Sequence, residues 1–179
     1  SAHKIGGPKG IGALYIGGRA KNTLPLLYGG GQEAGLRPGT EATAQIAGFA
    51  KAAALRRQCL EETWRHLADC RAYAVERLGE IPDLCFVGRG DAPHILSVSL
   101  PGYPSQNIVS ELSGKGICIS AGSACHRGRV SHVLSAMGLD KKTAAGTVRV
   151  SFGPETTRED IDQLASALLE HRRTRFPML

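Results

Sequence analysis

The sequence predicts an α/β fold, and three features of its pattern support that prediction. Residues 1–39 are rich in glycine and contain one strand-like run, IGALYI at residues 11–16. Residues 40–79 lack proline and repeat apolar side chains at helical spacing, as one long helix or two helices joined at a bend. After Pro82, short β-like runs alternate with helical stretches. Such an alternation is typical of a sheet covered by helices.

The last of these three regions predicts a compact α+β unit. Its final helix has the clearest signal, because Thr156 and Glu159 match a capping box and Ile161, Leu164 and Leu168 form an apolar stripe. The strands are predicted at residues 84–87, 95–100 and 147–152, and the helices at residues 106–114, 131–137 and 157–172.

Composition narrows the class of protein. With 179 residues, 42% of them hydrophobic, the chain can bury a sizeable core. The net charge of +6 comes from scattered lysines and arginines without interleaved aromatics, so we expect no nucleic-acid partner. No apolar run is long enough to span a membrane, and the N-terminus lacks the pattern of a secretory signal.

The cysteines favour a reducing compartment, and we expect the cytoplasm. They are odd in number, widely spaced and contain no C-x-x-C pair, which argues against a disulfide framework and against a metal site. They are Cys59, Cys70, Cys85, Cys118 and Cys125.

The N-terminal region offers too little apolar area to order so flexible a segment by itself. We therefore expect that it belongs to a larger sheet and that the chain is a fragment of a longer protein. Lys4 lies here among small residues, and the residues alone leave two interpretations: a solvated loop lysine or a Schiff-base lysine. The glycines match neither of the two common phosphate-binding loop motifs.

Four motifs occur in order along the chain: SAHKIGGPKGIGALYI, GGGQEAGLRPGTEATAQIAGFAKA, SAGSACHRG and SHVLSAMGL with VRVSFGPETTREDID. Together they resemble the C-terminal half of the cysteine desulfurases, pyridoxal-phosphate (PLP) enzymes of the class V aminotransferase type. The resemblance implies the C-terminal part of the PLP-dependent transferase fold. Residues 1–40 would be a remnant of the large PLP-binding domain, residues 41–80 a linking helical region, and residues 81–179 a small α+β domain that carries a mobile cysteine loop.

The resemblance also implies a cofactor site. Lys4 would form the Schiff base with PLP, and Ser1 and His3 would bind the cofactor phosphate. Thr40 would reach the phosphate of a neighbouring subunit, which implies a homodimer. From the residues alone, Thr40 is also a candidate N-cap for the helix that follows Gly39.

Cys125 is the second candidate centre. By itself it could be a small buried hydrophobic residue, as free cysteines commonly are. Gly122 and Gly128 bracket it and give the segment freedom to move, while the adjacent His126 and Arg127 favour the thiolate form. The resemblance makes Cys125 the nucleophile that takes the substrate sulfur as a persulfide.

Arg149 lies in the run TVRVSFG. Strand alternation directs Val148, Val150 and Phe152 to one face and Arg149 and Ser151 to the other. A solvent-facing arginine is the ordinary interpretation of this position. The resemblance makes Arg149 the residue that binds the substrate α-carboxylate, a task that suits its planar fork of donors.

The implied function is conversion of L-cysteine to L-alanine, with sulfur held on Cys125 for iron–sulfur clusters or other sulfur-containing cofactors. A sulfur-acceptor or scaffold protein would be the partner. We expect the fragment alone to be inactive, because the histidine and aspartate that complete a PLP site in this family should precede Ser1. A selenocysteine lyase or related PLP enzyme, or a non-catalytic sulfur-relay or docking module, remains an alternative. The common family pattern differs from this sequence at His126 and Arg127, and the segment 125–131 is shorter than in many members. These differences affect how far the Cys125 segment could reach toward a scaffold protein.

Overall fold

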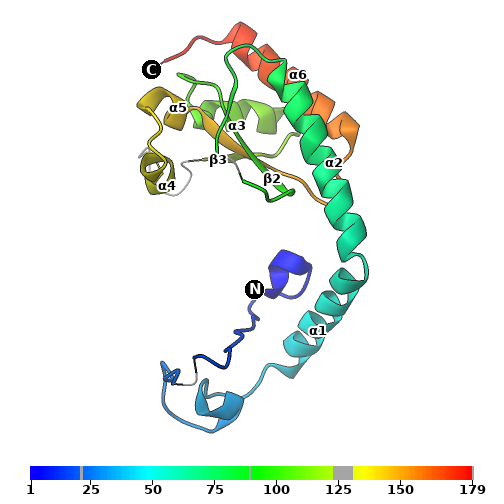
Figure 1. The fold of residues 1–179 in the computed structure, drawn as a ribbon, viewed down its shortest axis with the longest axis vertical. Helices are drawn as coiled ribbons and strands as arrows, with labels where there is room; N and C mark the ends of the chain where they lie inside the picture. Colours follow the sequence, from blue (N-terminus) through cyan, green and yellow to red (C-terminus); the bar gives the residue numbers. More distant parts are fainter. Residues whose placement is uncertain (21, 89, 123–130, 179) are drawn as a thin grey trace. The chain divides into compact units, whose positions relative to one another are not determined.

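The computed structural model describes residues 1–20, 22–88, 90–122 and 131–178 (Figure 1). The chain forms two compact units, Ser1–Leu60 and Glu61–Leu179. Their common boundary falls inside the predicted helical region. The three-part division at residues 40 and 80 stays a prediction.

The first unit contains two short 3-10 helices, η1 (Ala2–Ile5) and η2 (Gln32–Gly35), followed by α1 (Thr43–Gln58). The predicted strand at residues 11–16 is wrong, because this segment has no regular structure. The described part of this unit holds no strand that could pair with the run, and Leu14 and Tyr15 are exposed. An isolated β-like run cannot satisfy its backbone hydrogen bonds, whatever its side-chain pattern.

The predicted helical region is two helices, α1 and α2 (Leu60–Gly79), separated at Cys59. The N-cap prediction for Thr40 is wrong, because α1 begins at Thr43 with Ala42 at its N-cap and no side-chain cap. In α2, one stripe of side chains at helical spacing is buried: Leu67, Cys70, Ala74 and Leu78.

The second unit is built on a four-stranded antiparallel sheet of order β1-β2-β4-β3. Three strands lie within the predicted runs, and the two-residue β3 is one that the sequence pattern did not indicate. The strands are β1 (Cys85–Phe86), β2 (Ile95–Ser99), β3 (Ser120–Ala121) and β4 (Thr147–Ser151).

Helices cover one face of this sheet. Leu96 and Val98 of β2 and Val148 and Val150 of β4 are buried on that face, in one apolar core with α2, α3 and α6. The helices of this part are α3 (Ser105–Gly114), α4 (His132–Ala136), α5 (Lys141–Ala145) and α6 (Arg158–Thr174). The short α5 was not predicted.

The start of α6 shows a capping box one residue later than predicted. Thr157 is the N-cap, its hydroxyl accepts a hydrogen bond from the Asp160 backbone N–H, and Asp160 accepts one from the Thr157 N–H in return. The predicted pair of Thr156 and Glu159 is therefore wrong. The Thr156 hydroxyl accepts a hydrogen bond from the Gly153 N–H at 2.8 Å, so it completes the preceding turn instead.

A polar contact joins α2 to α6. Asp162 accepts hydrogen bonds from Arg77 Nε at 2.6 Å and from the Tyr73 hydroxyl at 2.9 Å. The bond from Arg77, followed by the bond from Tyr73, lowers the pKa of the Asp162 carboxyl. The contact is partly exposed, so it supplements the apolar core.

Candidate active site

Three predicted cofactor ligands lie on one tight turn of the first unit. Ala2 is fully buried, whereas Ser1, His3 and Lys4 on either side of it are exposed. The Lys4 backbone N–H donates to the Ser1 carbonyl at 3.3 Å, which brings the ends of the turn together. The helix ends at Ile5, and its C-cap Gly6 has a φ of 85°, in the left-handed region that glycine adopts without strain. The turn therefore buries an alanine and presents three polar side chains to solvent.

The glycines that follow Lys4 have a packing role. The Gly7 N–H donates to the Ala2 carbonyl at 2.9 Å, and a Cβ at Gly7 would lie 3.0 Å from the Ala2 Cβ. At Gly48 in α1, a Cβ would lie 2.7 Å from Pro8 Cγ. Glycine is therefore needed where the backbone passes close to its neighbours.

The residue types on this turn fit PLP. An aldehyde cofactor needs a primary amine, and a phosphate needs hydroxyl, imidazole or backbone donors. Lys4 supplies the amine, while Ser1 and His3 supply a hydroxyl and an imidazole within the same four residues. None of the ion pairs found among the described residues involves the Lys4 amine.

Thr40 ends a loop with an unusual backbone. Glu33 and Ala34 have φ values of 50° and 57°, in the left-handed region where a side chain costs about 1–3 kcal/mol. Gly35, with φ of 78°, extends this left-handed run. The loop then reaches Gly39, with φ of 113°, and the exposed Thr40. No hydrogen bond between Thr40 and the Ser1–Lys4 turn is found among the described residues.

Arg149 lies at the centre of β4, on the sheet face opposite the apolar core. It is exposed and pairs in register with Ser97 of β2 on one side and Ser120 of β3 on the other. The strand alternation predicted for this segment is confirmed, since Val148, Val150 and Phe152 are buried.

The contacts of the Arg149 guanidinium are few. Its Nη2 donates to the Ser120 hydroxyl at 3.4 Å. In the part of the chain that the structure describes, no carboxylate pairs with it. This arginine therefore has donors free to bind an anion, and it does not hold the fold together.

Cys125 lies outside the described residues, as do the neighbouring Gly128, His126 and Arg127. The described chain before it is fixed at Gly122, whose N–H donates to the Thr147 carbonyl at 2.8 Å. A Cβ at Gly122 would lie 2.9 Å from that same oxygen, so this position requires glycine. The chain is therefore held to β4 at the last described residue before Cys125.

At two of the other cysteines, burial disfavours the thiolate form. Burial, followed by the charge of Asp69, raises the pKa of the Cys70 thiol, and burial raises the pKa of Cys85. Because the thiolate is the reactive form, both side chains are disfavoured as sulfur acceptors near neutral pH.

The predicted residues fall in both units. Ser1, His3, Lys4 and Thr40 belong to the first unit, and Arg149 belongs to the second. The sequence interpretation missed Gln32, whose side-chain Oε1 accepts a hydrogen bond from the Gly39 N–H at 3.3 Å. Its position two residues after Gly30, in GGGQEAG, was the available signal.

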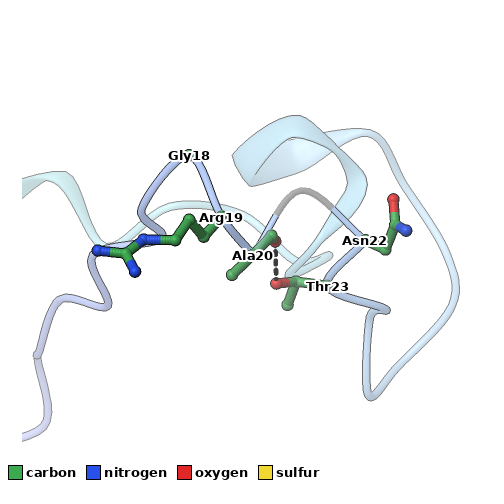
Figure 2. Close-up of a pocket in the computed structure, with 5 residues that line it drawn as sticks. All are labelled: Gly18, Arg19, Ala20, Asn22 and Thr23. Atoms are coloured by element: carbon green, nitrogen blue, oxygen red, sulfur yellow. Dashed lines mark hydrogen bonds between the residues drawn. The ribbon is translucent and has the colours of Figure 1, made fainter.

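A surface pocket on the first unit contains none of the candidate residues. It is lined by Gly18, Arg19, Ala20, Asn22 and Thr23. The Thr23 hydroxyl donates a hydrogen bond to the Ala20 carbonyl at 2.8 Å (Figure 2). Among the described residues, no group of three or more histidine, cysteine and acidic side chains is arranged to hold a metal ion. Within those same ranges, no helix is both long and apolar enough to cross a bilayer.

Comparison with known proteins decides the family. The profile of the aminotransferase class V family matches residues 1–164. The chain belongs to the class V aminotransferases. The class V aminotransferase type implied by the four sequence motifs is therefore confirmed, and members of this family depend on PLP in general.

Similar class V proteins carry the name cysteine desulfurase. The cysteine desulfurase IscS of Clostridium botulinum is 37% identical over 99% of this chain and 47% of its own length. The mitochondrial cysteine desulfurase of Candida albicans is 38% identical over 95% of this chain and 36% of its own length. The chain spans about half the length of the curated relatives it matches.

The fold prediction is confirmed by a solved structure. A NifS-like protein matches 98% of this chain and 45% of its own chain, with a TM-score of 0.82 and 34% sequence identity. This chain thus has the α/β architecture of one part of the PLP-dependent transferase fold.

Proposed function

We propose that this chain is the C-terminal part of a PLP-dependent cysteine desulfurase that converts L-cysteine to L-alanine. The observation that carries the proposal is the turn at Ser1–Lys4, where an exposed amine lies beside a hydroxyl and an imidazole in a class V aminotransferase. Similarity to proteins named cysteine desulfurase over nearly the whole chain supports this choice of reaction.

In this proposal, each residue has one task at the reaction centre. Ser1 and His3, together with Thr40 from a second subunit, bind the cofactor phosphate, and Lys4 binds the cofactor aldehyde. PLP, when bound, supplies an electron sink for the substrate carbon. The Arg149 guanidinium would bind the substrate carboxylate with two parallel donors, and the Lys4 amine would move the α-proton.

Sulfur transfer is assigned to Cys125. Its thiolate attacks the substrate sulfur, so that an S–S bond forms and the bond between the substrate Cβ and sulfur breaks. The electron pair of the broken bond remains with the carbon fragment, which takes up protons and leaves as alanine. The substrate sulfur remains on Cys125 as a persulfide, and a sulfur-acceptor or iron–sulfur scaffold protein then removes it.

The proposal also includes a homodimer and a cytoplasmic location. Sharing Thr40 across subunits requires the dimer. The odd number and wide spacing of the cysteines favour a reducing compartment.

A sulfur-mapping experiment tests the function directly. After limited L-cysteine, mass spectrometry of the full-length protein should find one additional sulfur on the peptide that contains Cys125, removable by a thiol reductant. Cys125→Ser should still bind PLP yet form almost no alanine, because a hydroxyl cannot accept the sulfur. Cys118→Ser is the matched control and should retain full turnover, since Cys118 is an exposed thiol without an assigned role.

Three results would contradict the proposal. The additional sulfur could appear on Cys118, Cys125→Ser could turn over normally, or selenocysteine could be a substrate while cysteine is not. A full-length protein that binds no PLP would favour a sulfur-relay or docking module instead.

A further inference from the structure

The loop of residues 29–40 is closed on itself by two contacts between its arms. Gln32 Oε1 accepts a hydrogen bond from the Gly39 backbone N–H at 3.3 Å. Gly29 lies against Pro38, since a Cβ at Gly29 would be 3.1 Å from the Pro38 Cβ. The arm that begins the loop is thereby joined to the arm that ends at Thr40.

The backbone of this loop is shaped around the Gln32 side chain. A Cβ at Gly30 would lie 2.3 Å from Gln32 Oε1, so a side chain at position 30 would displace the end of the Gln32 side chain. Directly after Gln32, Glu33 and Ala34 both adopt left-handed conformations that residues with side chains rarely take. Such strain persists only where the surrounding structure imposes it, and it concentrates at ligand clamps and active sites.

We propose that Gln32 is a positioning residue for binding of the cofactor phosphate. The inference rests on the proposed function, in which Thr40 binds the phosphate of PLP. By holding the N–H of Gly39, Gln32 restrains the peptide directly before Thr40 and so sets the direction of the Thr40 hydroxyl. Glycine at position 39, with φ of 113°, would otherwise leave that direction free.

The burial of these residues is consistent with Thr40 as the phosphate ligand and Gln32 as the residue that positions it. The Gln32 side chain is partly buried, whereas Gly39 and Thr40 are exposed. Gln32 is therefore less accessible than Thr40, and its side-chain oxygen already accepts a hydrogen bond from within the loop. It acts through Thr40 and does not contact the cofactor.

The test separates phosphate binding from general stability of the loop. Gln32→Met in the full-length apoenzyme keeps the length of the side chain and removes the acceptor oxygen. PLP and pyridoxal, which has the aldehyde without the phosphate, are each titrated into the variant. We expect PLP to bind about 2–10-fold more weakly, because one hydrogen bond is lost, and pyridoxal to bind as it does to the unchanged protein.

Gln45→Met is the matched control, because Gln45 is exposed on α1 within the same unit. It should leave both affinities unchanged. Equal weakening of PLP and pyridoxal by Gln32→Met would overturn the inference, since it would indicate a general structural role. Unchanged PLP affinity in Gln32→Met, with weakened affinity in Thr40→Val, would also overturn it while leaving the proposed function intact. Unchanged PLP affinity in Thr40→Val would contradict the proposed phosphate site itself.

Discussion

Replacing Arg149 by lysine separates substrate recognition from folding. Arg149 is exposed at the centre of β4, and its one described side-chain hydrogen bond is the 3.4 Å contact with Ser120. The free energy of unfolding should therefore change by no more than about 0.5 kcal/mol. Lysine keeps the charge but loses the planar fork, so one of the two donors to the substrate carboxylate is lost.

The expected increase in KM follows from the strength of the hydrogen bond that is lost. A hydrogen bond to a charged group contributes about 1.5–3 kcal/mol, which corresponds to about a 10- to 150-fold increase in the KM for L-cysteine. We expect the carboxylate to be bound equally in the ground state and in the transition state, so kcat should change little.

Steady-state kinetics of the full-length enzyme, measured as alanine formed, checks this expectation. PLP absorbance should be unchanged. Arg173→Lys is the control, because Arg173 is an exposed arginine at the end of α6. An unchanged KM in Arg149→Lys, or an equal increase in the control, would refute the role assigned to Arg149.

Lys4→Ala should abolish turnover and the visible absorbance of lysine-bound PLP with little loss of stability, because the side chain is exposed; retained turnover without added amine would refute its role. Gly146→Ala should cost about 1–3 kcal/mol in urea unfolding, because the new Cβ would lie 2.0 Å from the Leu100 carbonyl oxygen, whereas Gly114→Ala, with open space around it, should cost nothing. Asp162→Asn should destabilise the protein at neutral pH, because hydrogen bonds from Arg77 and Tyr73 lower the pKa of this carboxyl. That difference should vanish as the pH falls through the acid range below about 4, and a difference independent of pH would contradict the assignment.

Local patterns were sufficient for much of the second unit. The runs at residues 95–100 and 147–152 alternate apolar and polar side chains, and both contain strands whose alternate residues are buried. The exposure of Arg149 followed from the same alternation, because neighbouring side chains on a strand point to opposite faces. The polar side chains of the Ser1–Lys4 turn could likewise be identified from their types and order.

Tertiary contacts decided what the patterns left open. Residues 11–16 have a strand-like sequence but no partner strand within the described unit. The two residues of β3 are too few for a periodic signal, and they form a strand because they pair with β4. Thr156 and Thr157 are alike as caps in the sequence, and the hydrogen bond from Gly153 to Thr156 leaves Thr157 to begin α6.

The sequence by itself determined the family, the residue types of the proposed site and the alternation that exposes Arg149, because each depends on neighbours along the chain. Only the tertiary structure revealed the role of Gln32 in its loop. The bond from Gly39 to Gln32 depends on a left-handed turn at Glu33 and Ala34, and neither residue type favours that conformation. Such a conformation is imposed by contacts that close the loop, and these contacts produce no periodic pattern of residue types in the sequence.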